Sequence, residues 1–333
     1  MKILVEKDKT IYYSLDSSNL DSTKHIENFY ETTVIVLTYE PVKSRLWYTL
    51  DSILMQKKAN FEIIVSDDGS KENYFKEIIK YFENKKFKDY SIVLHNKNEG
   101  TVKNVFSAVK LAKGKFVKLI SPGDALVSSD TLCLWVEFLK KSGKQWSFGE
   151  ALYYTRTEEN KLFLTKKYCH PQIIDCYLKH KDEECRVNYV GFDDNALGSA
   201  VLCQTELMLK YLKKIIGKCI YAEDNSYRLM AFDNILPEYY PRAVIFYEYG
   251  TGISTSCDDA WYKKIRNDFE SADNIMLSSS KKDNIQKRIV EINKIKYRTG
   301  LFNRIRKKFF KGQIRMTFYK KFRPRMSKTD FTL

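Results

Sequence analysis

The stretches VIVLTYE, residues 34–40, and IIVSDDGS, residues 63–70, decide the fold of this chain. Each begins with a continuous apolar run that has the length of a buried strand, and each ends in polar residues typical of a turn. Two more apolar runs follow at 90–95 and 115–120, and segments with apolar residues at helical spacing separate them. This alternation predicts an α/β fold with a doubly wound, Rossmann-like, mainly parallel sheet.

Three polar segments come at the carboxyl ends of predicted strands. They are TYE at 38–40, DDGS at 67–70 and SPGD at 121–124. Ligands of such sheets bind beside the carboxyl ends of the strands, so we expect the functional site there. None of the segments contains a GxGxxG or P-loop pattern, and a glycine-rich helix start alone is therefore not expected to hold phosphates.

The composition is that of an ordinary globular protein. Of the 333 residues, 44% are hydrophobic and 30% are charged, which excludes a mainly disordered chain. No stretch approaches the ~20 apolar residues of a membrane span, and the first residues lack the pattern of a signal peptide. The seven cysteines form no C-x-x-C pair, and the loose group from Cys169 to Cys185 matches no zinc spacing. We expect reduced thiols and a cytoplasmic protein.

The positive charge is concentrated at the end of the chain. Residues 281–333 hold 18 Lys and Arg against 3 Asp and Glu, whereas the preceding residues carry balanced charge. Within 301–328, eleven basic residues accompany Phe and Ile side chains at helical spacing, which predicts a basic amphipathic segment. Such a segment suits an anionic membrane surface. Nucleic-acid binding, and a helix packed on the body with a solvated basic face, are the alternatives.

The ordered set of motifs resembles a family 2 glycosyltransferase with the GT-A fold, of the inverting, bacterial surface-polysaccharide type. The set comprises the two opening stretches, then residues 98–126, AEDNSYRLMA at 222–231 and YEYGTGIS at 247–254. The resemblance implies an N-terminal extension over 1–32, a GT-A domain over 33–256, and a mostly helical region with the basic tail over 257–333.

The resemblance assigns the first two polar segments to the nucleotide of a donor. Tyr39 would stack on the base, as aromatic rings do in a sequence-tolerant way, and Glu40 would reach the ribose. Asp67 and Asp68 would bind the nucleotide, with Asp68 accepting the uracil N3–H. The alternative is a surface tyrosine beside an Asp pair that only forms a turn with Gly69.

The resemblance places Lys103, Asn104 and Asp124 near the donor diphosphate. Lys103 and Asn104 stand where the family commonly has Arg-Asn, and Lys lacks the bidentate fork of Arg. Asp124 matches the last carboxylate of the family's acidic motif, where Mn²⁺ or Mg²⁺ would bridge it to the phosphates. The alternatives are a solvated lysine, an asparagine at a helix start and a turn-forming Asp.

Glu223 and Asp224 match the acidic pair that supplies the catalytic base in the family. Inverting transfer needs a base to take the proton of the acceptor hydroxyl. Asp224 is the expected base and Glu223 the alternative. Without the resemblance, two acids at this place would be interpreted as complementing a helix N-terminus.

Four further residues are assigned by the resemblance to the acceptor cleft or to a closing loop. Gly198 and Ser199 would line the acceptor cleft. Tyr249 and Ser254 lie in a late loop that would close over the donor, and Tyr249 stands where the family often has His.

Two classes of function follow. The first is an inverting hexosyl- or N-acetylhexosaminyltransferase that moves a sugar from a nucleotide diphosphate donor, expected to be a UDP-sugar, to a polysaccharide, glycan or lipid-linked hydroxyl in cell-surface glycan synthesis. It would work in the cytoplasm, peripherally on the inner face of the plasma membrane. The alternative is a nucleotide-binding α/β protein without transferase activity that uses its basic tail to bind nucleic acid or another partner.

Overall fold

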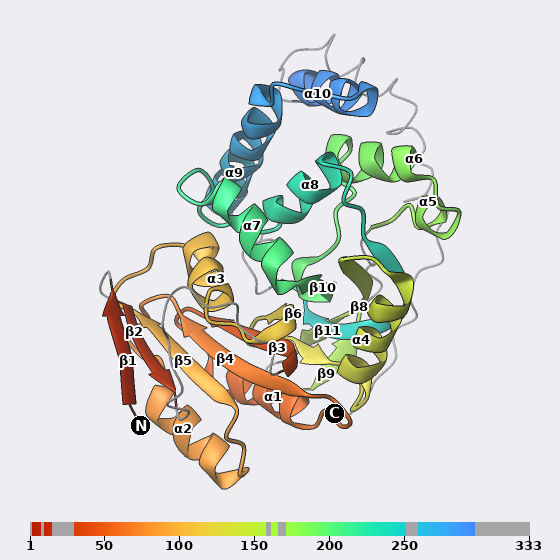
Figure 1. The fold of residues 1–333 in the computed structure, drawn as a ribbon. Coiled ribbons are helices and arrows are strands. Elements are labelled where there is room, and N and C mark those ends of the chain that lie inside the picture. The colour runs from red at the N-terminus through yellow and green to blue at the C-terminus, as the bar shows by residue number, and fades with distance from the viewer. Residues whose placement is uncertain are drawn as a thin grey trace.

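The structure is a computed structural model that describes residues 2–7, 10–14, 30–157, 161–165, 171–250 and 259–296. Its centre is one sheet in the order β1-β2-β5-β4-β3-β6-β10-β8-β11-β7, with β9 attached to β8 (Figure 1). Helices pack on both faces of this sheet, as the α/β prediction requires.

The four central strands are parallel and correspond to the four apolar runs of the sequence. They are β3 (Tyr30–Thr38), β4 (Phe61–Asp67), β5 (Tyr90–His95) and β6 (Gly114–Ile120). β3 lies between β4 and β6, and β4 pairs with β5. Every residue of β4 is buried, which explains why its sequence is a continuous run and does not alternate. The prediction of a parallel centre is confirmed.

Beyond β6 the sheet is mixed. β10 (Val201–Gln204) runs antiparallel between β6 and β8 (Trp146–Arg156), and β11 (Glu238–Glu248) runs parallel to β8. Because β10 opposes both of its neighbours, β8 and β11 point the same way as β6. The carboxyl ends of the central strands and of β8 and β11 therefore lie at the same end of the sheet.

Short strands complete both sides of the sheet. β7 (Ala125–Leu126) pairs with β11, and β9 (Leu162–Leu164) pairs with β8. At the other side, β1 (Lys2–Lys7) and β2 (Thr10–Ser14) form a hairpin, and β2 pairs antiparallel with β5. The hairpin of β1 and β2 therefore lies within the N-terminal extension and adds to the edge of the sheet.

The main helices form two layers. One face of the sheet carries α1 (Lys43–Leu54), α2 (Phe75–Asn84) and α4 (Thr131–Ser142). The other carries α3 (Thr101–Val109), α7 (Thr205–Ile215), α8 (Asn225–Phe232), α9 (Asp259–Ser278) and α10 (Asn284–Lys296). Shorter segments are α5 (Asp175–Leu178), α6 (Asp182–Arg186), the π-helix η1 (Val187–Gly191) and the 3₁₀ turn η2 (Gly198–Ala200).

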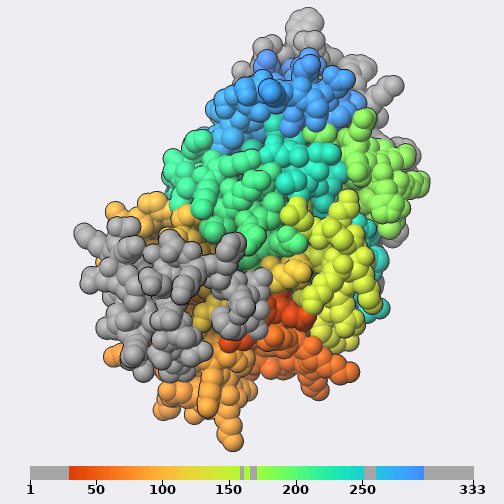
Figure 2. Space-filling view, in the orientation of Figure 1, coloured from red at the N-terminus to blue at the C-terminus, as the bar shows by residue number. Residues whose placement is uncertain are grey.

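The helical region that the sequence predicts after residue 257 is present as two helices, α9 and α10, separated at 279–283. Ala272, Met276 and Ile289 of these helices are buried in the same core as α7 and α8. Figure 2 shows them, in blue, packed onto the green and cyan segments that carry α7 and α8. Among the described residues, no helix is both long and apolar enough to cross a membrane.

Candidate active site

Tyr39 and Glu40 follow β3 directly and lie at the surface. The Tyr39 side chain is 53% exposed, so a planar group can reach its ring. Glu40 adopts a positive φ of 44°. Its backbone N–H donates to Ser70 Oγ at 2.7 Å, and its Oε1 accepts the N–H of Lys71 at 3.0 Å. Glu40 therefore joins the turn after β3 to the turn after β4.

Asp67 is buried and stabilises the turn after β4. Its carboxylate accepts the hydroxyl of Thr38 at 2.8 Å, and the hydroxyl and N–H of Ser70 at 2.7 and 2.8 Å. These bonds remain within the two turns. Asp67 therefore shapes this end of the sheet, and its contact with a nucleotide stays a prediction.

Asp68 is buried at the boundary between two loops. Its two carboxylate oxygens accept the backbone N–H groups of Glu99 and Gly100, each at 2.9 Å. Burial raises the pKa of Asp68, and the two amides oppose that shift. Gly100, with φ of 93°, must be glycine here because a Cβ would lie 2.4 Å from the side chain of Ile220. Asp68 thus fixes the loop that enters α3, and each oxygen keeps a second lone pair.

Lys103 and Asn104 occupy the first turns of α3 and point to different surroundings. Lys103 is partly exposed and pairs with Glu99 at 2.9 Å. Asn104 is buried, and its Nδ2 donates to the backbone oxygen of Ser66 at 3.1 Å while its Oδ1 accepts the Ser66 hydroxyl. Asn104 therefore anchors α3 on β4, whereas Lys103 stays close to solvent beside Glu99, in the loop that leads into α3.

Asp124 ends the SPGD turn and is buried. Its N–H closes the turn on Ser121 O at 3.0 Å, and its Oδ1 accepts the N–H of Glu248 at 3.3 Å. Burial raises the pKa of Asp124 to about 7, while the charge of Lys118 and the hydroxyl of Ser199 lower it. The turn thus presents a carboxylate whose ionisation is finely balanced by its neighbours.

Lys118 is a fully buried cation within β6. Its Nζ donates to the backbone oxygen of Ser199 at 2.5 Å, which ties the η2 turn to the strand. Burial lowers its pKa to about 7, and the negative charge of Asp124 opposes that shift. Sequence reasoning missed the signal of a lysine inside an apolar strand. A buried charge needs partners, so such a lysine indicates a buried polar cluster.

Besides Lys118 and Asp124, a second cluster of buried charges packs against the SPGD turn. Glu248, at the end of β11, accepts two bonds from Arg45 of α1, both at 2.8 Å, and lies 3.8 Å from Arg156 of β8. A Cβ at Gly123 would lie 2.5 Å from Glu248 Oε2, and Tyr154 donates its hydroxyl to Gly123 O. This cluster also escaped sequence reasoning, because its members are far apart in the chain.

The η2 turn brings the two acidic motifs together. Gly198 packs so closely on Asp224 that a Cβ would lie 2.3 Å from its Oδ1 and 3.4 Å from Glu223 Oε1. The backbone oxygen of the adjacent Ser199 accepts a bond from Lys118, whose charge acts on Asp124. Two sites that sequence reasoning treated separately are therefore neighbours, with one turn between them.

Glu223 and Asp224 are partly exposed and stand just before α8. Burial raises the pKa of both carboxyl groups, and the charge of Asp224 raises that of Glu223 further. Among the described residues, no hydrogen-bond donor reaches Asp224 Oδ1. A carboxylate with a raised pKa and an unused oxygen is suited to accept a proton near neutral pH.

The late loop is described only at its beginning. The N–H of Tyr249 donates to Tyr154 O at 2.8 Å, and its ring lies edge-on to Tyr153 at a centroid distance of 6.1 Å. Tyr249 therefore extends the pairing of β8 and β11 next to Glu248. Ser254 and the basic tail over 301–328 lie outside the described residues.

A divalent cation fits this site only as a one-carboxylate site. In the described part of the chain, no three His, Cys, Asp or Glu side chains gather as metal ligands. Glu248, the acid next to Asp124, is engaged by Arg45. Mg²⁺ is commonly held by one or two carboxylates with substrate phosphates and water completing its shell. Asp124 meets that minimum once donor phosphates are present.

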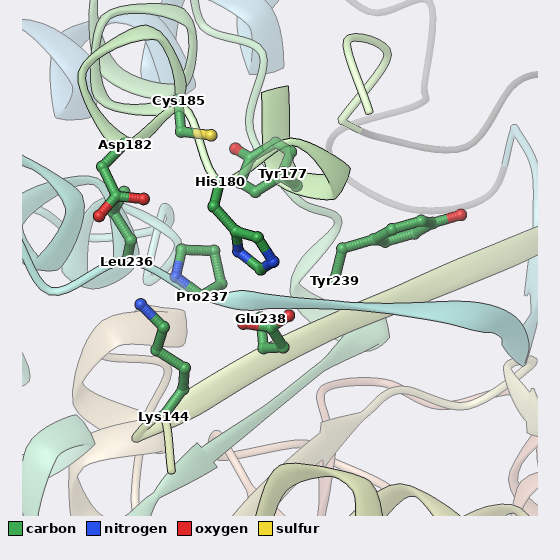
Figure 3. Close-up of a pocket in the computed structure, with 9 residues that line it drawn as sticks. All are labelled: Lys144, Tyr177, His180, Asp182, Cys185, Leu236, Pro237, Glu238 and Tyr239. Carbon is green, nitrogen blue, oxygen red and sulfur yellow. The ribbon is translucent and has the colours of Figure 1, made fainter. Parts of the chain in front are cut away.

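A small pocket lies at the opposite, amino ends of β8 and β11. Figure 3 shows Lys144 and Glu238 beside these strands, facing His180, Asp182 and Cys185 of the α5–α6 segment. It has room for about one water molecule. Its size and place exclude it as a nucleotide site.

Asp68 and Asp124 follow the carboxyl ends of β4 and β6 in a parallel α/β centre, and the η2 turn lies between Asp124 and the Glu223–Asp224 pair. Residues 33–202 match the model of glycosyl transferase family 2, about half of the chain. The chain belongs to this family.

A curated relative is an uncharacterized glycosyltransferase of Rickettsia bellii (strain RML369-C). It is 32% identical over 124 residues, which cover 36% of this chain and 17% of that protein. The matched part is therefore a small portion of the relative, and the match carries no statement about its other regions.

Solved structures share the fold at low identity. Residues 1–349 of S. aureus TarS in complex with UDP give a TM-score of 0.51 at 18% identity, covering 78% of this chain and 69% of that one. The same fragment with UDP-GlcNAc gives 0.53 at 17%, covering 80% and 73%. The mannosyltransferase PcManGT of Pyrobaculum calidifontis, in complex with GDP-Man and Mn²⁺, gives 0.55 at 13%, covering 90% and 87%. The fold is that of the GT-A glycosyltransferases.

Proposed function

We propose that this protein is an inverting glycosyltransferase that moves a sugar from a nucleotide diphosphate donor to an acceptor hydroxyl. One observation carries the proposal: the Gly198–Ser199 turn packs against Asp224 on one side and is bound on the other by Lys118, whose charge acts on Asp124. A carboxylate on the leaving-group side and a base on the acceptor side are what a single displacement at the anomeric carbon requires.

Asp224 acts as the base in this proposal. The acceptor oxygen attacks the anomeric carbon, its proton passes to Asp224, and the bond from that carbon to the diphosphate oxygen breaks. One displacement on the face opposite the leaving group inverts the configuration. Glu223 is the alternative base, because it shares the raised pKa and the contact with Gly198.

Asp124 faces the diphosphate in this proposal, and Lys103, in the first turn of α3, is the cation proposed to assist it. A divalent cation held by Asp124 and the donor phosphates would neutralise the charge that develops on the leaving group. The structure of PcManGT in complex with GDP-Man and Mn²⁺ supports this assignment.

We propose a UDP-sugar as the donor, with Tyr39 stacked on the base and Glu40 beside the ribose. Asp68 supports the proposal of uracil as the base. Its remaining lone pairs can accept the N3–H of uracil while its bonds to Glu99 and Gly100 hold the loop before α3. TarS binds UDP and UDP-GlcNAc, whereas PcManGT binds GDP-Man, so the fold accommodates either base.

The proposed acceptor is a polysaccharide, glycan or lipid-linked hydroxyl used in cell-surface glycan synthesis, and the transferred group is a hexosyl or N-acetylhexosaminyl residue. The basic segment 301–328 supports a place on the anionic inner face of the plasma membrane. The domain limits 1–32, 33–256 and 257–333 remain part of the proposal.

The test is a donor screen with the purified full chain. UDP-glucose, UDP-galactose, UDP-GlcNAc, UDP-GalNAc and GDP-mannose are each incubated with Mn²⁺, with Mg²⁺ or with EDTA, and released nucleoside diphosphate is measured. We expect release from at least one UDP-sugar and a matched loss in Asp224→Asn. Tight UDP binding without release from any donor, with or without a panel of glycan acceptors, would instead support the nucleotide-binding protein without transferase activity.

A further inference from the structure

The loop that leads into the acidic pair is held by a carboxylate from the C-terminal helices. Asp268 of α9 is buried, and its Oδ2 accepts the backbone N–H groups of three successive residues, Ile220, Tyr221 and Ala222, at 3.0, 2.6 and 2.8 Å. Its Oδ1 also lies 3.0 Å from the Ile220 nitrogen. Three consecutive amides can converge on one carboxylate only when the backbone curves around it. Asp268 therefore fixes the curvature of the chain directly before Glu223.

The loop 220–222 also contacts residues 100–102 at the start of α3, on the side where the donor is proposed to bind. The N–H of Val102, in the first turn of α3, donates to Ile220 O at 3.0 Å. Gly100 packs on the Ile220 side chain without room for a Cβ, and its own N–H is bound by Asp68. Ile220 is thus in contact with the start of α3 on one side and with α9 on the other.

The helix that carries Asp268 is itself fixed in place. Asp273, one turn further along α9, is buried and accepts bonds from Arg228 of α8 at 2.8 Å and from Asn293 of α10 at 2.9 Å. Because α8 begins at the acidic pair, α9 contacts both the segment before Glu223 and the helix after Asp224. A shift of α9 would move the pair relative to the donor loop.

We propose that Asp268 is a positioning residue that sets the place of Glu223 and Asp224 against the donor. This inference rests on the proposed function. It makes the helical C-terminal region a part of the catalytic machinery. Removal of the carboxylate releases three amides immediately before the base, and a displacement of about 1 Å at a catalytic group can lower turnover about 100-fold.

The experiment compares Asp268→Ala, which removes every acceptor, with Asp268→Asn, which keeps one oxygen. Glu62→Ala is the matched control, because it also removes a buried carboxylate that accepts a backbone N–H, that of Lys113 at 2.6 Å, and leaves α9 and the 220–222 amides untouched. For each full-length variant, kcat and KM for the donor, UDP affinity by calorimetry and hydrogen exchange of the peptide spanning 219–224 are measured.

We expect Asp268→Ala to lower kcat about 100-fold and Asp268→Asn to lower it less, with exchange in the 219–224 peptide rising in the same order. UDP affinity and donor KM should stay within about twofold of wild type, because the Asp68 and Gly100 contacts are retained. Glu62→Ala should keep wild-type kcat and wild-type exchange in that peptide.

Wild-type kcat in Asp268→Ala, or faster loop exchange without a change in kcat, would overturn the positioning role. An equal kcat loss in Glu62→Ala would also overturn it, since the effect would then follow general stability. A wild-type protein that releases no nucleoside diphosphate would refute the proposed function and this inference with it. An active wild type with indifferent Asp268 variants would refute the inference alone.

Discussion

Replacing Asp224 by Asn should separate catalysis from stability. The substitution keeps the shape of the side chain, so the close packing of Gly198 on its Oδ1 position is retained. It replaces the basic carboxylate by a neutral amide, which cannot take the proton of the acceptor hydroxyl. Donor binding should survive, because the donor contacts of Asp68 and Asp124 are on other segments.

The expected loss of turnover is the typical contribution of a general base, about 10²- to 10⁴-fold. At 1.36 kcal/mol for each factor of ten, this corresponds to about 2.7–5.4 kcal/mol of barrier. The pH dependence has a defined sign. Burial raises the pKa of Asp224, and the base is active only when it is deprotonated. As the pH is lowered, the wild-type rate should therefore begin to fall at a pH well above the ordinary range of an aspartic acid, and then drop about tenfold per pH unit.

The stability of the folded protein should fall as the pH rises, whereas the rate should increase. A carboxyl group whose pKa is higher in the folded than in the unfolded state makes the folded protein bind more protons, so stability falls as pH rises between the two values. Asp224→Asn cannot ionise, and it should therefore lose less stability than wild type between pH 5 and pH 8.

Two assays check this prediction. Diphosphate release between pH 5 and pH 9 gives the rate, and urea unfolding at pH 5 and pH 8 gives the stability. Glu223→Gln serves as the matched variant of the neighbouring acid. Near-normal turnover in Asp224→Asn together with inactive Glu223→Gln would transfer the base to Glu223. Loss of both activity and stability in Asp224→Asn would mean that its carboxylate is structural and would refute the reasoning.

Four further predictions concern binding, stability and the tail. Asp68→Ala should weaken UDP binding by about 1–3 kcal/mol, as loss of a buried acceptor does, and calorimetry showing equal affinity for UDP and GDP in wild type would reject uracil recognition. Asp124→Ala should abolish most transfer, whereas full wild-type activity in EDTA would assign the counter-charge to a protein cation such as Lys103. Glu248→Ala leaves Arg45 without its partner in a part-buried place and should lower the free energy of unfolding by about 3–5 kcal/mol in urea titrations, and a change under 1 kcal/mol would contradict the supporting role. Removal of 301–333 should abolish salt-sensitive co-sedimentation with anionic vesicles and retain donor turnover, while unchanged sedimentation would reject membrane docking by the tail.

The strands and their ligand-binding end could be predicted from the sequence because both are local signals. A continuous apolar run at 63–65 is buried on both faces only in a parallel sheet covered by helices, and the polar turn after it marks the carboxyl end of the strand. The same reasoning placed Asp68 and Asp124 at that end, since each lies in a polar segment that follows a strand, whereas Asp224 was expected at the site only from the resemblance to the family.

Only the tertiary structure decided which of these residues share a site and what holds them. Asn104 was expected at the nucleotide, but its side chain turns onto β4, and no pattern in the sequence reports the direction of one amide. Arg45 and Glu248 are 203 positions apart, and Asp268 meets Ile220 across 48. Periodicity records which face of an element is buried. It does not record which buried charge faces which amide or guanidinium, because the low dielectric of the interior requires a partner without specifying where in the chain it lies.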